Sequence, residues 1–249
     1  MNNLSIIKFG GSLIKTPKIQ NKFLKELASV SKEAKNILVH GGGSEINFLL
    51  DKFQIKSKFL NGLRLTDKQT LEIAELALSG KVNRIIVSNL LKYGANPVGI
   101  SAKDAKSIIC KKIKKLGFVG TPVKTNRKLI ETLLNYSFVP VIASIACDKN
   151  GNSLNVNADE VANALACAFK AKRLIFLTDV CGVLDKNKKL IEKIEIREIP
   201  NLIKNQTITG GMIPKIKSCQ HAISKGVKEV WICNGSVSIK NLKGTIIKR

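Results

Sequence analysis

The sequence predicts an α/β fold with three layers, in which helices cover both faces of a largely parallel open sheet. Three observations support this prediction. Short runs rich in Val, Ile and Leu alternate with longer segments of helical periodicity, the loops between them are short, and two apolar runs lead directly into glycine clusters. With 249 residues and 44% hydrophobic content, the chain can bury a substantial core. No Pro- or Ser-rich linker interrupts it, so we expect a single domain over 1–249.

The period of the apolar residues places each element in order. Strands are predicted at 4–9, 36–40, 95–100, 139–146, 173–178 and 229–233. Helices are predicted at 17–35, 44–53, 67–80, 81–93, 127–136, 159–170 and 211–226. Two further β-type segments, 107–112 and 117–124, predict a hairpin. Ser44, directly after three glycines, is a candidate N-cap.

Three glycine clusters indicate anion-binding loops. Two of them, Gly10-Gly11 and Gly41-Gly42-Gly43, follow strand-like runs, and Gly210-Gly211 precedes a helix that carries Lys215 early. Glycine lets the backbone approach an anion, and a helix start supplies free N–H groups. Neither the dinucleotide-binding pattern nor the Walker pattern is present, which disfavours those two classes. Taken alone, each cluster is also compatible with an ordinary tight turn, and His40 with either a packed residue or a substrate contact.

A formal charge of +24 raises the alternative of a non-catalytic nucleic-acid binder. Lysine accounts for 36 of the 42 basic residues, whereas specific recognition of bases and phosphates relies heavily on arginine. The lysines are also spread along the whole chain. We therefore expect a solvated basic surface without specific nucleic-acid binding.

Cellular location and cysteine use follow from composition. The chain has no apolar run of 18 residues and no secretory leader, so we expect a cytoplasmic protein that does not bind membranes. None of the six cysteines forms a C-x-x-C pair, and their surroundings are mostly apolar. They predict buried, reduced thiols rather than a disulfide framework or a metal site.

Six motifs together suggest a family. They are Lys8-Phe9-Gly10-Gly11-Ser12, His40-Gly41-Gly42-Gly43, Asn61-Gly62-Leu63-Arg64-Leu65-Thr66-Asp67, Asn155-Val156-Asn157-Ala158-Asp159, Thr178-Asp179-Val180-Cys181-Gly182-Val183-Leu184 and Thr209 to Lys215. In this order they resemble the amino-acid kinase family, and specifically its branch that phosphorylates N-acetyl-L-glutamate. The resemblance implies the amino-acid kinase fold, with an acceptor-binding lobe over about 1–172 and a nucleotide-binding lobe over about 173–249.

The implied reaction transfers the γ-phosphoryl group of ATP to the γ-carboxylate of N-acetyl-L-glutamate, a step of arginine biosynthesis. Phosphoryl transfer depends mainly on positioning and on neutralising charge. A carboxylate nucleophile is ionised at neutral pH, so no general base is needed. Mg²⁺ is expected to arrive on the ATP phosphates, with no metal site built from the protein.

The resemblance also assigns residues to roles. Lys8 and Lys215 are the expected catalytic charges on opposite sides of the phosphoryl group, and Asp159 is expected to orient both. The acceptor residues are Gly42, Gly43, Arg64 and Asn155, with the Arg64 fork on the α-carboxylate. The expected nucleotide-binding residues are Gly10, Gly11, Thr178, Asp179, Gly182, Val183, Leu184, Thr209, Gly210, Gly211 and Met212.

Two departures and one alternative qualify the resemblance. Ala102 and Ala105 stand where the family commonly has glycines, so a turn with positive φ would be strained there. The alternative is a kinase of the same family that acts on aminoadipate or glutamate attached to a small acidic carrier protein, which the high positive charge would suit. The Asn-Gly-Leu-Arg motif favours free N-acetyl-L-glutamate instead.

Assembly is a further expectation. Arginine-inhibited hexameric members of the family carry an extra N-terminal helix, whereas this sequence begins its first predicted strand at about Leu4. Three residues are too few for a stable helical turn. We therefore expect a homodimer that arginine does not inhibit.

Overall fold

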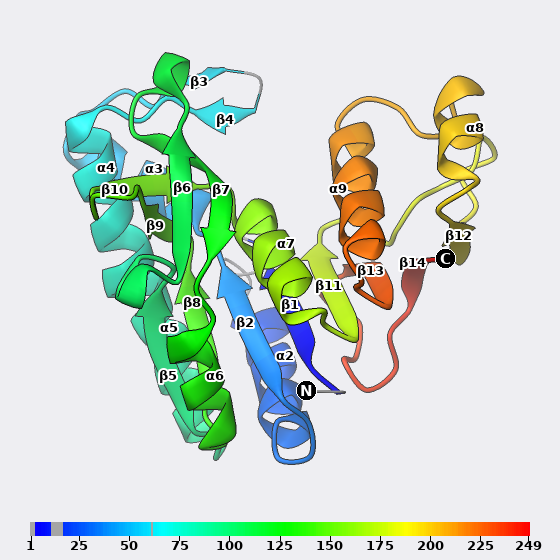
Figure 1. Ribbon diagram of the computed structural model, residues 1–249, viewed down its shortest axis with the longest axis horizontal. Helices are drawn as coiled ribbons and strands as arrows, with labels where there is room; N and C mark the ends of the chain where they lie inside the picture. Colours follow the sequence, from blue (N-terminus) through cyan, green and yellow to red (C-terminus); the bar gives the residue numbers. More distant parts are fainter. Residues whose placement is uncertain (1–2, 11–16, 61) are drawn as a thin grey trace.

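The computed structural model describes residues 3–10, 17–60 and 62–249. Its central sheet has eight strands in the order β12-β14-β13-β11-β1-β2-β8-β5 (Figure 1). Every neighbouring pair is parallel except β13 and β14, so the predicted open, largely parallel sheet is confirmed. The strands are β1 (Ser5–Phe9), β2 (Asn36–His40), β5 (Pro97–Ser101), β8 (Val139–Ala143), β11 (Arg173–Thr178), β12 (Lys193–Glu195), β13 (Glu229–Asn234) and β14 (Gly244–Lys248).

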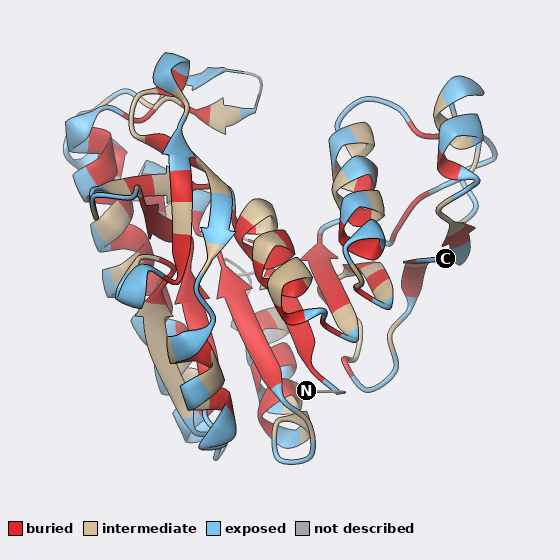
Figure 2. Cartoon of the chain, in the orientation of Figure 1, coloured by how far each residue is buried: buried red, intermediate tan, exposed pale blue. Residues whose placement is uncertain are grey.

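Helices cover both faces of this sheet, as three layers require. On one face lie α6 (Lys128–Asn135), α7 (Ala158–Phe169) and α9 (Met212–Ser224), and on the other α2 (Pro17–Val30) and α5 (Asn83–Lys92). Successive side chains of β1 point to opposite faces, so Ile6 packs in the α7 layer and Ile7 in the α2 layer. The central strands are accordingly buried on both sides (Figure 2). The short helix α8 (Ile199–Lys204) precedes α9.

A small closed barrel stands beside the carboxyl end of the sheet. It consists of β6 (Ile108–Lys112), β7 (Val119–Thr125), β9 (Ile145–Cys147) and β10 (Ser153–Val156). The pair β6 and β7 is antiparallel, which confirms the predicted hairpin. The single strand predicted at 139–146 is wrong, because the chain leaves the main sheet at Ser144 and enters the barrel as β9. Two-residue strands, β3 (Phe59–Leu60) and β4 (Leu63–Arg64), form a separate hairpin.

The two helices predicted at 67–80 and 81–93 form one continuous run. It comprises α4 (Lys68–Glu75), a π-helical segment η1 (Leu76–Val82) and α5. No break separates these three segments, because the residues at both junctions keep right-handed helical backbone angles. The preceding helix α3 (Gly43–Lys52) has Gly42 at its N-cap, so the N-cap role expected of Ser44 is wrong.

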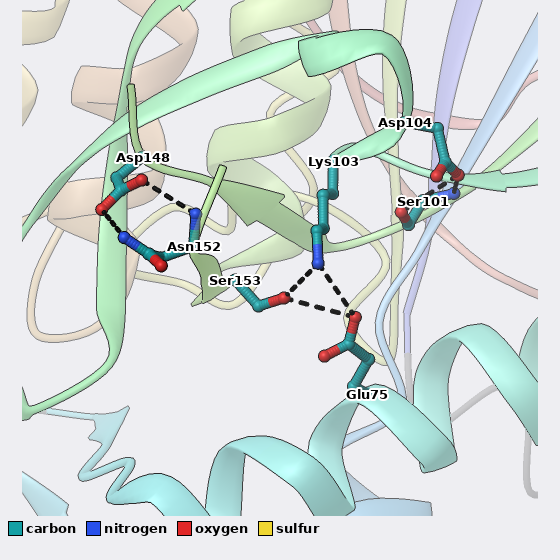
Figure 3. Close-up of polar contacts among 7 residues, drawn as sticks. All are labelled: Glu75, Ser101, Lys103, Asp104, Asp148, Asn152 and Ser153. Atoms are coloured by element: carbon teal, nitrogen blue, oxygen red, sulfur yellow. Dashed lines mark hydrogen bonds and ion pairs between the residues drawn. The ribbon is translucent and has the colours of Figure 1, made fainter. Parts of the chain in front are cut away.

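The turn after β5 has the expected strain at Ala105, whereas Ala102 is not among the residues with positive φ. Ala105 has φ 50° and ψ 26°, a left-handed conformation that costs free energy for any residue with a Cβ atom. The neighbouring Asp104 carboxylate accepts hydrogen bonds from the Ser101 N–H at 2.7 Å and hydroxyl at 3.1 Å (Figure 3). Lys103 donates to the Ser153 hydroxyl at 2.8 Å, which ties this turn to β10.

The cysteines follow the prediction with one correction. All six are free; Cys110, Cys147, Cys219 and Cys233 are buried and Cys167 is half-buried. Cys181 is exposed, so its predicted burial is wrong: it lies in the loop after β11, outside the packed layers. In the described residues, no cluster of three or more His, Cys, Asp or Glu side chains could hold a metal ion. No helix in that part of the chain is long and apolar enough to cross a membrane.

Candidate active site

Three charged side chains that are far apart in the sequence meet at the carboxyl end of the sheet. The Lys8 ammonium lies 3.0 Å from Oδ1 of Asp159, and the Lys215 ammonium lies 3.8 Å from Oδ2 of the same carboxylate. Their side chains are 16% to 24% exposed, so the cluster is partly desolvated and still open to a ligand. The structure therefore brings together the three residues expected to be catalytic.

Local structure explains how each charge is positioned. Lys8 is on β1, whose neighbours β2 and β11 hold it in register at the centre of the sheet. Asp159 lies in the first turn of α7, where Asn157 is the N-cap and accepts the Asp159 N–H at 2.8 Å. A carboxylate is favourable at a helix N-terminus, whereas the cation of Lys215 in the first turn of α9 is not. Asp159 offsets that unfavourable placement.

Gly10 lets the backbone pass close to this cluster. A Cβ atom at this position would lie 2.9 Å from the carbonyl oxygen of Leu177 and 3.6 Å from Nζ of Lys8. Any larger residue would therefore push against the neighbouring strand β11. Gly11, also expected to bind nucleotide, lies outside the described residues.

The four expected acceptor residues line one cavity of about 180 Å³. Gly42 and Gly43 come from the start of α3, Arg64 from β4 and Asn155 from β10. Leu78 of η1 provides part of the apolar wall. Four segments distant in the sequence thus converge on a space lined by the Arg64 guanidinium, the amides of Asn155 and Asn157, and glycine backbone.

Arg64 is held in place by several partners. It is 8% exposed; one guanidinium nitrogen donates to Oδ1 of Asn47 at 2.7 Å and to the Gly43 carbonyl at 3.3 Å, and the other to the Ser57 hydroxyl. The ring of Phe59 lies 4.7 Å from the guanidinium carbon. Burial lowers the pKa of Arg64, but an arginine remains charged at neutral pH.

Sequence reasoning did not identify Asn47 and Ser57 as supports of Arg64. The available signal was weak: Asn47 is one helical turn after Gly43, on the same face of α3. Neither residue belongs to a motif that carries chemistry by itself.

His40 is a packed residue that supports the glycine loop. It is fully buried, and its Nε2 lies 3.0 Å from the Asn83 amide nitrogen, which also donates to the Val141 carbonyl at 2.9 Å. Because Nε2 accepts, Nδ1 carries the proton and donates to the Gly41 carbonyl at 2.9 Å. Burial lowers the pKa of His40 to about 4, so the ring is neutral at physiological pH.

The expected nucleotide-side residues fall into two groups. Thr178 and Asp179 lie at the carboxyl end of β11, where the Thr178 hydroxyl donates to Asp179 at 2.8 Å. This hydrogen bond is the main cause of the lowered pKa of Asp179, to which the charges of Lys215 and Lys8 also contribute. The second group, Thr209 to Met212, leads into α9, and a Cβ atom at Gly210 or Gly211 would meet no other part of the structure within 4 Å.

The loop after β11 is more constrained than expected. Gly182 has φ 148°, and a Cβ there would lie 2.6 Å from Oγ1 of Thr245. The side chain of Val183 is buried in the core, and its N–H donates to the same Thr245 hydroxyl at 2.8 Å. A side-chain contact between Val183 and a nucleotide is therefore unavailable, whereas Leu184 is exposed.

Comparison with known proteins agrees with this geometry. Residues 3–234 match the model of the amino acid kinase family. The chain belongs to this family. It is 60% identical over 249 residues to the acetylglutamate kinase of Endomicrobium trichonymphae, and the match spans the whole of both chains.

Two further proteins are similar to this chain over most of its length. The acetylglutamate kinase of Mesorhizobium japonicum is 41% identical over 245 residues, which is 92% of this chain and 82% of that protein. A crystal structure of a Streptococcus mutans UA159 protein superimposes with a TM-score of 0.86 at 31% identity, over 100% of this chain and 99% of that one. Both similarities therefore extend over at least 92% of this chain.

Proposed function

We propose that this chain transfers the γ-phosphoryl group of ATP to the γ-carboxylate of N-acetyl-L-glutamate, forming N-acetyl-L-glutamyl 5-phosphate in arginine biosynthesis. The observation that carries the proposal is the pair of ammonium groups on Asp159 beside a cavity lined by Arg64 and Asn155. The names of the two curated relatives supply the acceptor, N-acetylglutamate. We also propose that the protein works in the cytoplasm.

Charge neutralisation is the main chemical task at this site. The acceptor carboxylate is already ionised at neutral pH, so it attacks phosphorus without a general base. Lys8 and Lys215 balance the negative charge on the transferring group, and Asp159 keeps both ammonium groups in position. Arg64 binds the α-carboxylate, and Asn155 with the backbone of Gly42 and Gly43 contacts the rest of the acceptor.

ATP is proposed to bind across the two nucleotide-side segments, with Mg²⁺ carried on its phosphates. The support is the space around Gly210 and Gly211, where a Cβ atom would meet no other part of the structure within 4 Å, because glycine there lets the backbone approach a phosphate closely. The first turn of α9 adds no free N–H group, since the Met212 and Ile213 N–H groups donate to the Thr209 and Gly210 carbonyls and Pro214 has none. Mg²⁺ would supply further neutralisation of the phosphate charge when bound. The positive charges that the protein itself brings to the phosphates are those of Lys8 and Lys215.

We further propose two lobes, 1–172 for the acceptor and 173–249 for the nucleotide, and a homodimer. Large apolar side chains on η1 and α5 support the dimer: Leu76 is 60% exposed, Leu91 57% and Ile85 39%. A second copy that covers them would remove apolar surface from water. Light scattering at several protein concentrations tests this; a monomer at all of them would contradict it.

The activity is tested by coupled ADP release from purified protein with MgATP and three acceptors: N-acetyl-L-glutamate, L-glutamate and L-2-aminoadipate. Hydroxylamine converts an acyl phosphate into a hydroxamate, which identifies the product directly. We expect turnover and hydroxamate with N-acetyl-L-glutamate only. Activity with aminoadipate or glutamate instead, or ADP release that no acceptor stimulates, would overturn the proposal.

A further inference from the structure

We propose that Asn163 is a positioning residue for phosphoryl transfer: its bond to α9 holds the backbone that carries Lys215 in place relative to Asp159. This inference rests on the proposed function. Asn163 lies on α7 and is 7% exposed. Its amide nitrogen donates to the Ser218 carbonyl at 2.8 Å and lies 2.5 Å from the Ser218 hydroxyl oxygen, on α9.

The orientation of the Asn163 carboxamide is also fixed. The thiol of Cys167, one turn further along α7, donates to its Oδ1 at 3.1 Å. Because Oδ1 of Asn163 accepts this hydrogen bond within α7, the amide nitrogen of the same side chain faces α9. The donor is thereby preorganised for the other helix.

The spacing connects this contact with the active site. Asn163 follows Asp159 by four residues and Ser218 follows Lys215 by three, so each pair occupies one face of its helix. The Asn163 to Ser218 contact therefore lies about one helical turn, roughly 5.4 Å, from the ion pair. The same two helix surfaces carry both interactions.

The ion pair of Lys215 with Asp159 and the hydrogen bond of Asn163 to Ser218 differ in how well they can fix the position of α9. Lys215 reaches Asp159 through a flexible side chain at 3.8 Å, which does not fix the helix backbone. Asn163 bonds to a backbone carbonyl, so it fixes α9 itself along its axis. Apolar packing of Ile216 and Cys219 keeps α9 on the sheet, but such contacts are non-directional.

In the described residues, two side-chain polar contacts join α9 to other elements: the ion pair of Lys215 with Asp159 and the bond of Asn163 to Ser218. Asn163 and Ser218 line an open groove of about 530 Å³ between β7 and α9. This groove is open to solvent. A directional contact at its base is suited to setting the position of α9.

The experiment compares Asn163→Ala and Asn163→Leu with Asn36→Ala. Asn36 is a matched control: it is 4% exposed, and its amide also donates twice, to the Ala34 carbonyl at 2.8 Å and the Ser31 hydroxyl at 3.2 Å, but at the opposite end of the sheet. We expect both Asn163 variants to lower kcat ~10- to 100-fold, the effect of a displacement near 1 Å. KM for N-acetyl-L-glutamate should stay within about twofold, because Arg64 is not moved. Asn36→Ala should lower stability but leave kcat unchanged.

A double-mutant cycle separates positioning from a general structural effect. If Asn163 acts through Lys215, Asn163→Ala should change kcat less than about threefold in a Lys215→Ala background. Equal effects in both backgrounds, or normal kcat in folded Asn163→Ala, would overturn the inference. Lack of kinase activity in the unmodified protein would instead refute the proposed function, so the two failures are distinguishable.

Discussion

Lys8 and Lys215 place two positive charges on one carboxylate, and in the proposed function both neutralise the transferring group. We expect Lys8→Ala and Lys215→Ala each to reduce turnover by ~10²- to 10⁴-fold, as for the loss of one preorganised charge. The measurement is kcat for acetylglutamate-dependent ADP release. Lys193→Ala is a control, since it removes an ion pair of 2.8 Å with Glu195 on β12, away from this cluster. Near-normal turnover in either active-site variant would refute the assignment.

Arg64 is expected to act on binding rather than on the chemical step. The α-carboxylate is remote from the bond that forms, so its contact is similar in the ground and transition states. Arg64→Ala should raise KM for N-acetyl-L-glutamate roughly 10- to 150-fold, equivalent to ~1.5–3 kcal/mol. Arg64→Lys keeps the charge but loses the planar fork and should recover part of the affinity. An effect confined to KM for ATP would contradict this role.

His40 predicts how stability depends on pH. It titrates near 6.5 in the unfolded chain, but burial lowers its pKa to about 4 in the folded protein. Between these values the unfolded state binds more protons, so the free energy of unfolding falls as the pH falls from about 7 to 4. The full effect is about 3 kcal/mol, at 1.36 kcal/mol per pKa unit.

Urea unfolding of the unmodified protein and His40→Gln across this pH range measures the contribution. Glutamine is not titratable, so the variant should show a smaller loss of unfolding free energy on acidification, whatever its stability at neutral pH. Identical pH profiles would show that His40 is not responsible.

At the scale of elements, the π-helical segment η1 packs against the glycine loop. A Cβ at Gly42 would lie 2.7 Å from Cδ2 of Leu78 and 3.1 Å from Cγ2 of Val82. Gly42→Ala should therefore displace Leu78 or the loop, with an overpacking cost of about 1–3 kcal/mol. Because Leu78 also lines the acceptor cavity, KM for N-acetyl-L-glutamate should rise.

Gly80→Ala, within η1, is the matched control for Gly42→Ala. Gly80 is exposed, and nothing lies within 4 Å of a Cβ at that position. Gly80→Ala should leave KM unchanged and stabilise the fold by about 0.5–1 kcal/mol, since alanine favours helix over glycine. Thermal unfolding and acceptor titrations on both variants test this contrast. Equal effects of the two substitutions would show that close packing at Gly42 is unimportant.

At the scale of the whole molecule, the charge of +24 predicts a weak, unspecific affinity for polyanions. With six arginines and 5% aromatic residues, the chain has few side chains that could form base-specific hydrogen bonds or stack on bases. Binding to duplex DNA should lose ~10³-fold or more in affinity between 50 and 200 mM salt if several phosphates are contacted. Fluorescence anisotropy with two unrelated duplexes measures it. Tight, sequence-selective binding at physiological salt would favour a nucleic-acid function instead.

The sequence by itself determined the main sheet, whereas the charged cluster was predicted from the resemblance of its motifs to the amino-acid kinase family. Val- and Ile-rich runs fix strands such as β1 and β11 locally, and parallel strands align their carboxyl ends at one edge. The resemblance selected Lys8, Asp159 and Lys215, and the predicted elements placed Lys8 near the end of a strand and the other two in the first turns of helices. Periodicity could not predict short strands such as β10 or β12, which have too few residues to show it.

Only the tertiary structure decided how the site residues are supported. Asn47 and Arg64 are 17 residues apart, His40 and Asn83 are 43 apart, and Asn163 and Ser218 are 55 apart. Each of these hydrogen bonds depends on directional geometry that exists only after the helices pack on the sheet. Local propensity determines which residues form a strand or a helix, whereas partners of polar side chains depend on the distances between elements, which no local pattern encodes.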